Sequence, residues 1–213
     1  MTAICAVPAE RRALRPLVGP RLRVLVSGMG PVAARRTARQ ALADPPSRAL
    51  LAVGFCGALS ADLRVGDLVA GMTVRGPDGR SFAADPALLQ ASGARGVTMV
   101  STGSPARTPT ERSRLAGDAV DMESAAVACE AARAGLPFLA LRAVTDARHH
   151  RLPDLAHAID ATGRVRPPAL LLHLLAHPAD LVRTARLAWG SWRAGRALRR
   201  GVAGLLDRLP AQP

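Results

Sequence analysis

Residues 137–144 form a short, almost wholly apolar run that starts at a Gly-Leu-Pro turn and ends at a Thr-Asp pair. A run of this length and composition is typical of a strand that is buried on both faces. Similar runs at residues 2–7, 22–26 and 49–55 alternate with Ala-rich stretches of helical character. Such alternation indicates a largely parallel sheet with helices on both faces. We therefore predict an α/β fold, a single domain with a central mixed, largely parallel sheet flanked by helices.

Helices are predicted from composition and from the residues at their ends. A proline in the first helical position and the Ala-rich stretch after it predict a helix over residues 31–42. A second helix is expected over residues 123–134, which Gly135 ends. From Pro167 onward the chain is predicted to be helical, with an interruption at Pro178.

The middle of the chain gives weaker patterns. Strands are expected after the turn at residues 65–69 and again at residues 96–100. Residues 75–95 are rich in Gly, Pro and Asp and are predicted to form loops. Residues 101–110 are also expected to be loop, followed by a short helix that ends near residue 115.

Composition excludes several classes of function. The net charge is +13, yet all 29 basic residues are arginine, as in proteins with GC-rich coding sequences. No nucleic-acid-binding motif accompanies this charge, and with only 2% aromatic residues the chain has few side chains for base stacking. We therefore expect no nucleic-acid partner.

The cysteines and the apolar segments favour a cytoplasmic protein. The three cysteines are widely spaced, without a CxxC motif or a Cys/His cluster at zinc spacing. Reduced thiols are therefore expected, and neither a metal nor an organic cofactor is predicted. The chain has no run of about 20 uncharged apolar residues, as a membrane-spanning helix requires, and its first apolar run is too short for a signal peptide.

Three carboxylates follow predicted strands. Glu10 comes after the first apolar run, Glu123 after a Val-Asp-Met segment, and Asp146 after the run at residues 137–144. Ligands of α/β sheets gather at the carboxyl ends of strands. Each acid taken singly is equally compatible with a solvated surface position or a helix cap. Their shared position makes them candidates for one site.

Four motifs occur in a fixed order along the chain: SGMGPVAA at residues 27–34, VGDLV at 65–69, VDMESA at 120–125 and RAVTD at 142–146. This series resembles the motifs of the methylthioadenosine/S-adenosylhomocysteine nucleosidases, within the purine nucleoside phosphorylase superfamily. The pair DMES and RAVTD is the most specific part of the resemblance. The resemblance implies an enzyme that cleaves the N-glycosidic bond of a purine nucleoside.

Within that superfamily the chain is most similar to the hopanoid-associated phosphorylases, the adenosylhopane nucleosidases. The similar features are the DMES motif, the GRVRP turn at residues 163–167 and the Arg-rich helical tail beyond Pro178. The resemblance implies a catalytic domain at residues 1–166 and a C-terminal helical extension at residues 167–213. It also implies release of adenine from adenosylhopane in hopanoid biosynthesis. The alternatives are a methylthioadenosine/S-adenosylhomocysteine nucleosidase and a purine nucleoside phosphorylase that uses phosphate in place of water.

The same resemblance implies roles for the acids. Asp146 would protonate or hydrogen-bond purine N7, which near neutrality requires burial to raise the pKa of its carboxyl. Glu123 would accept hydrogen bonds from the ribose hydroxyls, and Met122 would pack on the apolar face of the sugar or belong to the core. Glu10 aligns with the general base that activates water.

Two further segments are candidate substrate-binding elements. Ser27, Gly28 and Gly30 precede a predicted helix, where backbone N–H groups form an anion site, although a plain strand-to-helix glycine turn explains them equally well. Phe55 and Gly57 stand where related nucleosidases have a Ser/Thr-rich or Gly-Gly segment. Phe55 either stacks on the base or fills the core, and both interpretations stay open.

The tail at residues 181–209 is amphipathic. Six of its seven arginines fall on one side of a helical wheel and most of its leucines on the other, with Trp189 and Trp192 beside the basic side. One interpretation is a basic amphipathic helix that packs on the domain or on a second subunit. The other is an interfacial helix in peripheral contact with anionic lipid of the inner membrane. Family likeness implies a homodimer.

Overall fold

The computed structural model describes residues 1–43, 47–160 and 164–210. The strands in these residues are β1 (Thr2–Cys5), β2 (Arg23–Val26), β3 (Leu50–Ala58), β4 (Leu68–Arg75), β5 (Ser81–Ala83), β6 (Arg95–Ser101), β7 (Ala119–Asp121) and β8 (Phe138–Asp146). The helices are α1 (Pro8–Leu14), α2 (Pro31–Ala43), α3 (Pro86–Ser92), α4 (Pro109–Ser113), α5 (Ser124–Arg133), α6 (Pro167–Ala176) and α7 (Ala179–Arg208), with a short 3₁₀ turn η1 (Arg15–Leu17). The predicted α/β fold is confirmed.

The sheet is mixed, as predicted, and part of it closes on itself. The strand order is β2-β1-β3-β7-β6-β4-β5, and β8 pairs with both β3 and β4. Strands β3, β7, β6, β4 and β8 therefore form a closed ring, from which β1, β2 and β5 extend. Pairing is parallel for β1–β3 and β3–β8 and antiparallel for β3–β7 and β4–β8. This closure brings the ends of β3, β7 and β8 together.

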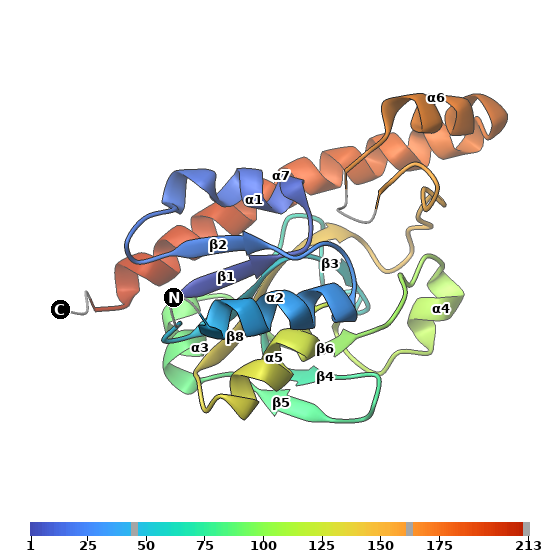
Figure 1. Ribbon diagram of the computed structural model, residues 1–213. Coiled ribbons are helices and arrows are strands. Elements are labelled where there is room, and N and C mark those ends of the chain that lie inside the picture. Colours follow the sequence, from blue (N-terminus) through green and yellow to red (C-terminus); the bar gives the residue numbers. More distant parts are fainter. Residues whose placement is uncertain (44–46, 161–163, 211–213) are drawn as a thin grey trace.

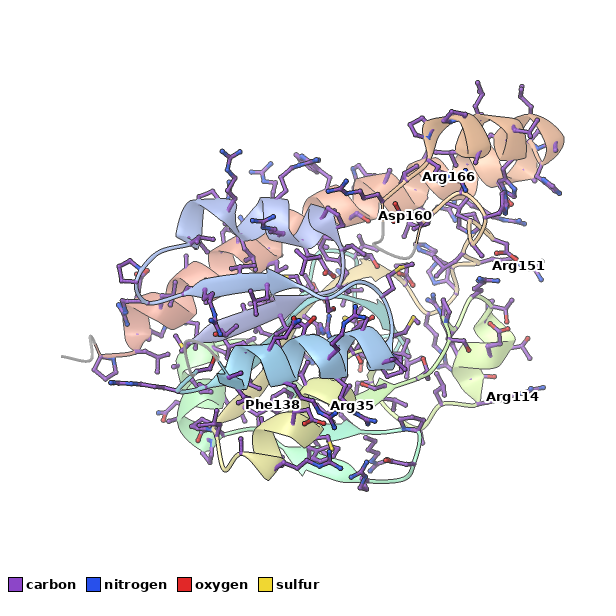
Figure 2. The ribbon with its side chains drawn as sticks, in the orientation of Figure 1. Arg35, Arg114, Phe138, Arg151, Asp160 and Arg166 are labelled. Atoms are coloured by element: carbon purple, nitrogen blue, oxygen red, sulfur yellow. The ribbon has the colours of Figure 1, made fainter. Side chains whose placement is uncertain are left out.

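The core has two halves, one on each face of β3, because successive side chains of a strand point to opposite faces. Leu50 and Ala52 face α2 and α5, whereas Leu51 and Val53 face α1 and α7. Figure 1 shows α1 and α7 above β1 and β2, and α2 and α5 below these two strands. Arg35 of α2 lies beside α5 in Figure 2, and it forms an ion pair with the buried Glu130.

The prediction of loops over residues 75–95 is wrong, because that segment contains strand β5 and helix α3. Asp85 caps α3 by accepting a hydrogen bond from the Leu88 N–H at 2.9 Å. Pro86 occupies the first helical turn and Gly93, at φ 59°, ends the helix in the left-handed conformation. The Gly, Pro and Asp content that indicated loops therefore supplies the two ends of a short helix.

Helix α7 carries its apolar stripe into the core. Leu198, Val202 and Leu205 are buried against the sheet and α3, as the packing interpretation of the tail requires. Glycine at position 201 lets α7 pack closely against β4, since a Cβ there would collide with Leu68. Toward its N-terminal end the same helix runs beyond the sheet and pairs with α6 (Figure 1). Gly163 of the GRVRP motif lies outside the described residues.

The structure also bears on membrane insertion. Within residues 1–43, 47–160 and 164–210, no helix combines the length and the apolar character that a membrane crossing needs.

Candidate active site

The three candidate carboxylates converge on one cavity of about 220 Å³ where the ends of β3, β7 and β8 meet. Glu10 comes from the start of α1, Glu123 from the junction of β7 and α5, and Asp146 from the end of β8. All three are more than nine-tenths buried. The predicted binding residues that line the same cavity are Phe55, Gly57 and Met122.

Glu10 is held by the backbone on both of its oxygens. Oε2 accepts hydrogen bonds from the N–H groups of Ala6 at 2.7 Å and Val7 at 3.0 Å, and Oε1 accepts one from Phe55 at 2.7 Å. Burial raises the pKa of Glu10, opposed by the nearby Arg142 and by these three N–H groups. The carboxylate is therefore fixed in orientation and more basic than a solvated glutamate, as a general base requires.

Arg142 is the cation at the centre of the acidic cluster. Its Nη2 lies 2.5 Å from Oδ2 of Asp121 and 3.8 Å from Oε2 of Glu123. It also donates to the Ser124 hydroxyl. Gly54 makes room for this group, since a Cβ there would collide with both Arg142 and Glu10. Arg142 thus serves as a buried ion-pair partner of Asp121 and Glu123.

Glu123, the second of the three carboxylates, is hydrogen-bonded to the glycine turn at residues 27–30. Its Oε1 accepts a hydrogen bond from the Gly30 N–H at 2.8 Å. Burial raises the pKa of Glu123 to about 7, with Arg142 opposing the shift and Asp121 adding to it. Gly28 and Gly30 have φ angles of 87° and 90°, so the turn needs glycine. Because Glu123 accepts the Gly30 N–H, this donor of the predicted anion site already has a carboxylate partner.

The rest of the turn lies behind the cavity wall. The Ser27 hydroxyl donates to the carbonyls of Cys5 at 3.2 Å and Gly28 at 2.6 Å. Met29 lines the cavity, whereas Ser27, Gly28 and Gly30 do not. Gly30 therefore holds Glu123, and the turn that the three residues form carries Met29 into the cavity wall.

Asp146 has a partner that sequence reasoning missed. Its Oδ1 accepts a hydrogen bond from the Thr145 hydroxyl at 2.6 Å, and its Oδ2 forms an ion pair with Nη2 of Arg112. Arg112 belongs to α4 and is 1% exposed. The chain has so many arginines that no pattern around Arg112 distinguishes it. Arg112 thus places a cation beside Asp146 in the wall of the cavity.

The other chemically reactive groups near the site are structural. Burial raises the pKa of the Cys56 thiol, which keeps it protonated and unreactive. Cys5 and Cys129 are free and buried as well. Among the described residues no group of three His, Cys, Asp or Glu side chains is arranged to hold a metal ion.

The family model of the phosphorylase superfamily matches residues 5–176. The chain belongs to the phosphorylase superfamily. The predicted enzyme class is confirmed at that level. No curated protein matches the chain in sequence.

Solved structures of similar fold align with more of the chain than the family model does. They include futalosine hydrolase of Helicobacter pylori, with a TM-score of 0.74, 14% identity and coverage of 98% of this chain and 97% of that one. A mutant nucleosidase of Helicobacter pylori with 5′-methylthioadenosine in its active site has a TM-score of 0.74 and 15% identity, covering 98% of each chain. The S-adenosylhomocysteine nucleosidase of Streptococcus pyogenes has a TM-score of 0.76 and 17% identity, covering 99% of this chain and 97% of that one. At these identities the phosphorylase-superfamily chain shares the fold of all three.

Proposed function

We propose that this chain is a nucleosidase that hydrolyses the N-glycosidic bond of an adenosine derivative and releases adenine. The observation that carries the proposal is the convergence of Glu10, Glu123 and Asp146 on one cavity. The proposal is supported by superfamily membership and by the similar fold of a nucleosidase that holds 5′-methylthioadenosine.

Each carboxylate has a distinct role in the proposed reaction. Cleavage passes through an oxocarbenium-like state, in which the electron pair of the C1′–N9 bond moves to the purine. A water oxygen bonds to C1′, and the proton of that water passes to Glu10. Glu123 accepts hydrogen bonds from the ribose hydroxyls, with Met122 against the sugar. Asp146 binds the leaving purine, with Phe55 and Gly57 beside it.

Water is favoured over phosphate as the nucleophile. The Gly30 N–H of the predicted anion site donates to Glu123, and Arg142 is surrounded by Asp121, Glu123 and Ser124. A phosphate entering here would meet the side chains of Glu10, Glu123 and Asp146 in one cavity, and like charges repel each other. The electrostatics therefore support hydrolysis.

Adenine release assayed with and without phosphate tests this proposal. The expected result is the same rate of release under both conditions, with free ribose derivative as the second product. A ribose 1-phosphate product would replace the proposal by its alternative, a purine nucleoside phosphorylase. No adenine release from any adenosine derivative would exclude both.

The proposed substrate is adenosylhopane, and the activity would then belong to hopanoid biosynthesis. A substrate with a polycyclic lipid at the ribose 5′ position stays in a bilayer, so the enzyme must meet it at the membrane surface. The projecting α6 and the start of α7 expose large apolar side chains: Leu171, Leu172, Leu175, Leu181, Val182, Trp189 and Trp192. Arg193 lies over the ring of Trp189, and Arg196 lies over the ring of Trp192. In both pairs the guanidinium carbon is 4.9 Å from the ring centroid. This combination suits the interface of an anionic inner membrane.

The alternative substrate is methylthioadenosine or S-adenosylhomocysteine, free in the cytoplasm. Comparing kcat/KM for adenosylhopane in anionic vesicles with that for methylthioadenosine in solution discriminates between the two. We also propose a homodimer, which sedimentation equilibrium of the full chain tests.

A further inference from the structure

The position of Arg112 is determined by two loops. Thr108 caps α4, its hydroxyl accepting from the Glu111 N–H at 3.2 Å while Glu111 accepts from the Thr108 N–H at 2.9 Å. Arg112 then donates from Nε to the Ala106 carbonyl at 3.0 Å and from Nη1 to the Ala147 carbonyl at 2.8 Å. The guanidinium thereby joins the loop before α4 to the loop after β8. Its Nη2 is left beside Asp146, in the wall of the cavity.

The Asp146–Arg112 pair has unused hydrogen-bonding capacity. Asp146 Oδ2 is buried, and among the described residues it has no hydrogen-bond partner of good geometry beyond the ion-pair contact. A guanidinium carries five N–H donors, of which the carbonyls of Ala106 and Ala147 take two and Asp146 one. An acceptor and a donor therefore lie side by side at the cavity. A carboxylate oxygen has two lone-pair sites, so Oδ2 can accept from a donor on a ligand in addition to its contact with Arg112.

Oδ2 of Asp146 and Nη2 of Arg112 both lie close to Gly57. A Cβ at Gly57 would lie 3.0 Å from Oδ2 of Asp146 and 3.5 Å from Nη2 of Arg112. Gly57 itself lines the cavity. A ligand edge next to this glycine can therefore reach the carboxylate and the guanidinium at the same time.

Adenine has the matching edge. Its exocyclic 6-amino group is a donor and the adjacent N7 is an acceptor, whereas a 6-oxopurine presents acceptors at both positions. The carboxylate of Asp146 beside the guanidinium of Arg112 therefore complements the adenine edge. With a 6-oxopurine, the same carboxylate would face the O6 acceptor.

We propose that Arg112 donates a hydrogen bond to purine N7 while the Asp146 carboxylate accepts one from the 6-amino group. This inference rests on the proposed nucleosidase function and assigns a further catalytic residue to it. A guanidinium keeps its proton at physiological pH, so Arg112 stabilises charge and does not act as an acid. As the C1′–N9 electron pair moves to the purine, the fixed positive charge at N7 neutralises the developing negative charge. The departing base then takes its proton from water.

Base binding tests the contact independently of turnover. Calorimetry on the wild-type chain compares adenine, 7-deazaadenine and hypoxanthine between pH 6 and pH 9. We expect adenine to bind about 10- to 100-fold more tightly than 7-deazaadenine, the usual effect of a hydrogen bond to a charged donor, and hypoxanthine to bind more weakly than adenine. The ratio of adenine to 7-deazaadenine affinity should stay constant over this pH range, because the guanidinium does not titrate. A ratio that collapses as pH rises would assign the donor to a protonated carboxyl, and a ratio near one would remove the N7 contact.

Arg112→Met supplies the matched variant, since methionine has no donor. The affinity ratio should fall to near one in Arg112→Met. Arg114→Met is the control, since Arg114 lies two residues further along, is exposed, and points away from the molecule in Figure 2. An unchanged ratio in folded Arg112→Met would overturn the assignment. If that variant does not fold, the wild-type ratios and their pH dependence decide the question.

The outcomes for the contact and for the function are separable. A chain that binds adenine with this pattern but releases no adenine from adenosine derivatives keeps the Arg112 contact and loses the proposed function. Adenine release without the N7-dependent binding keeps the function and overturns the inference.

Discussion

Gly190 of α7 lies directly against the backbone carbonyl of Thr145, the residue that precedes Asp146 in β8. A Cβ at position 190 would overlap that carbonyl oxygen. The C-terminal helix therefore supports the strand end that carries Asp146. Although residues 167–213 were assigned to an extension, this part of α7 is in direct contact with the site.

Gly190→Ala should consequently destabilise the protein and lower its activity. Overpacking of this kind costs about 1–3 kcal/mol, and the displaced β8 end would move Asp146. Denaturant unfolding and adenine release measure the two effects. Gly195→Ala is the control, since its Cβ would lie 3.5 Å from that of Ala13, an ordinary contact. There the better helix propensity of alanine should leave stability unchanged or raise it by up to about 1 kcal/mol. Equal effects of the two substitutions would contradict the close contact.

Glu10→Gln should lower kcat by about 10²- to 10⁴-fold, because an amide cannot take a proton from water. The amide nitrogen would also face a backbone N–H that now donates to the carboxylate, costing about 1–3 kcal/mol of stability. Initial rates at saturating substrate, together with thermal unfolding, check both effects. Gln40→Glu, on the exposed side of α2, controls for a change of charge. A variant with near-wild-type kcat would exclude Glu10 as the base.

Glu123 should make stability fall as pH rises from about 4.5 to 7. Burial raises the pKa of Glu123 to about 7 from the ordinary 4.5. Between these values the folded chain holds a proton that the unfolded chain has lost, so raising the pH favours unfolding. The shift corresponds to roughly 3 kcal/mol. Relative to wild type, Glu123→Gln should gain about this much unfolding free energy between pH 4.5 and pH 7. A difference that does not vary with pH would contradict the raised pKa.

The exposed face of α6 should carry the proposed membrane contact. Leu171→Ser combined with Leu172→Ser should weaken sedimentation with anionic vesicles at least about tenfold, since each leucine loses buried apolar area. Binding should also weaken with salt, because arginines contribute to it. Val32→Ser on α2, which is 82% exposed, is the control. A wild-type chain that ignores anionic vesicles at low salt would exclude membrane contact. A change of oligomeric state in the double variant would identify the face as a subunit interface.

Much of the architecture was predictable because it is encoded locally. The apolar run at residues 137–144 became the buried β8, and the stretch after Pro31 became α2. The three acids were predictable because each stands at or shortly after the carboxyl end of a strand, where ligands of α/β sheets gather. Even α3, which was predicted as loop, has its cap residues in the sequence. The composition of that segment is typical of loops, whereas the order of its residues supplies the cap and the end of a helix.

Other features depend on contacts between distant segments. Pairing of β8 with both β3 and β4 closes the sheet, and such non-local pairing leaves no periodicity in the sequence. Gly54 must be glycine only because Glu10 and Arg142 reach it from other elements. Arg112 is one of many arginines, and only the packing of α4 under the β8 loop buries it against Asp146. The sequence by itself determined which acids stand at strand ends. Tertiary structure decided which cation faces each of them, because burial and charge pairing depend on distance in space.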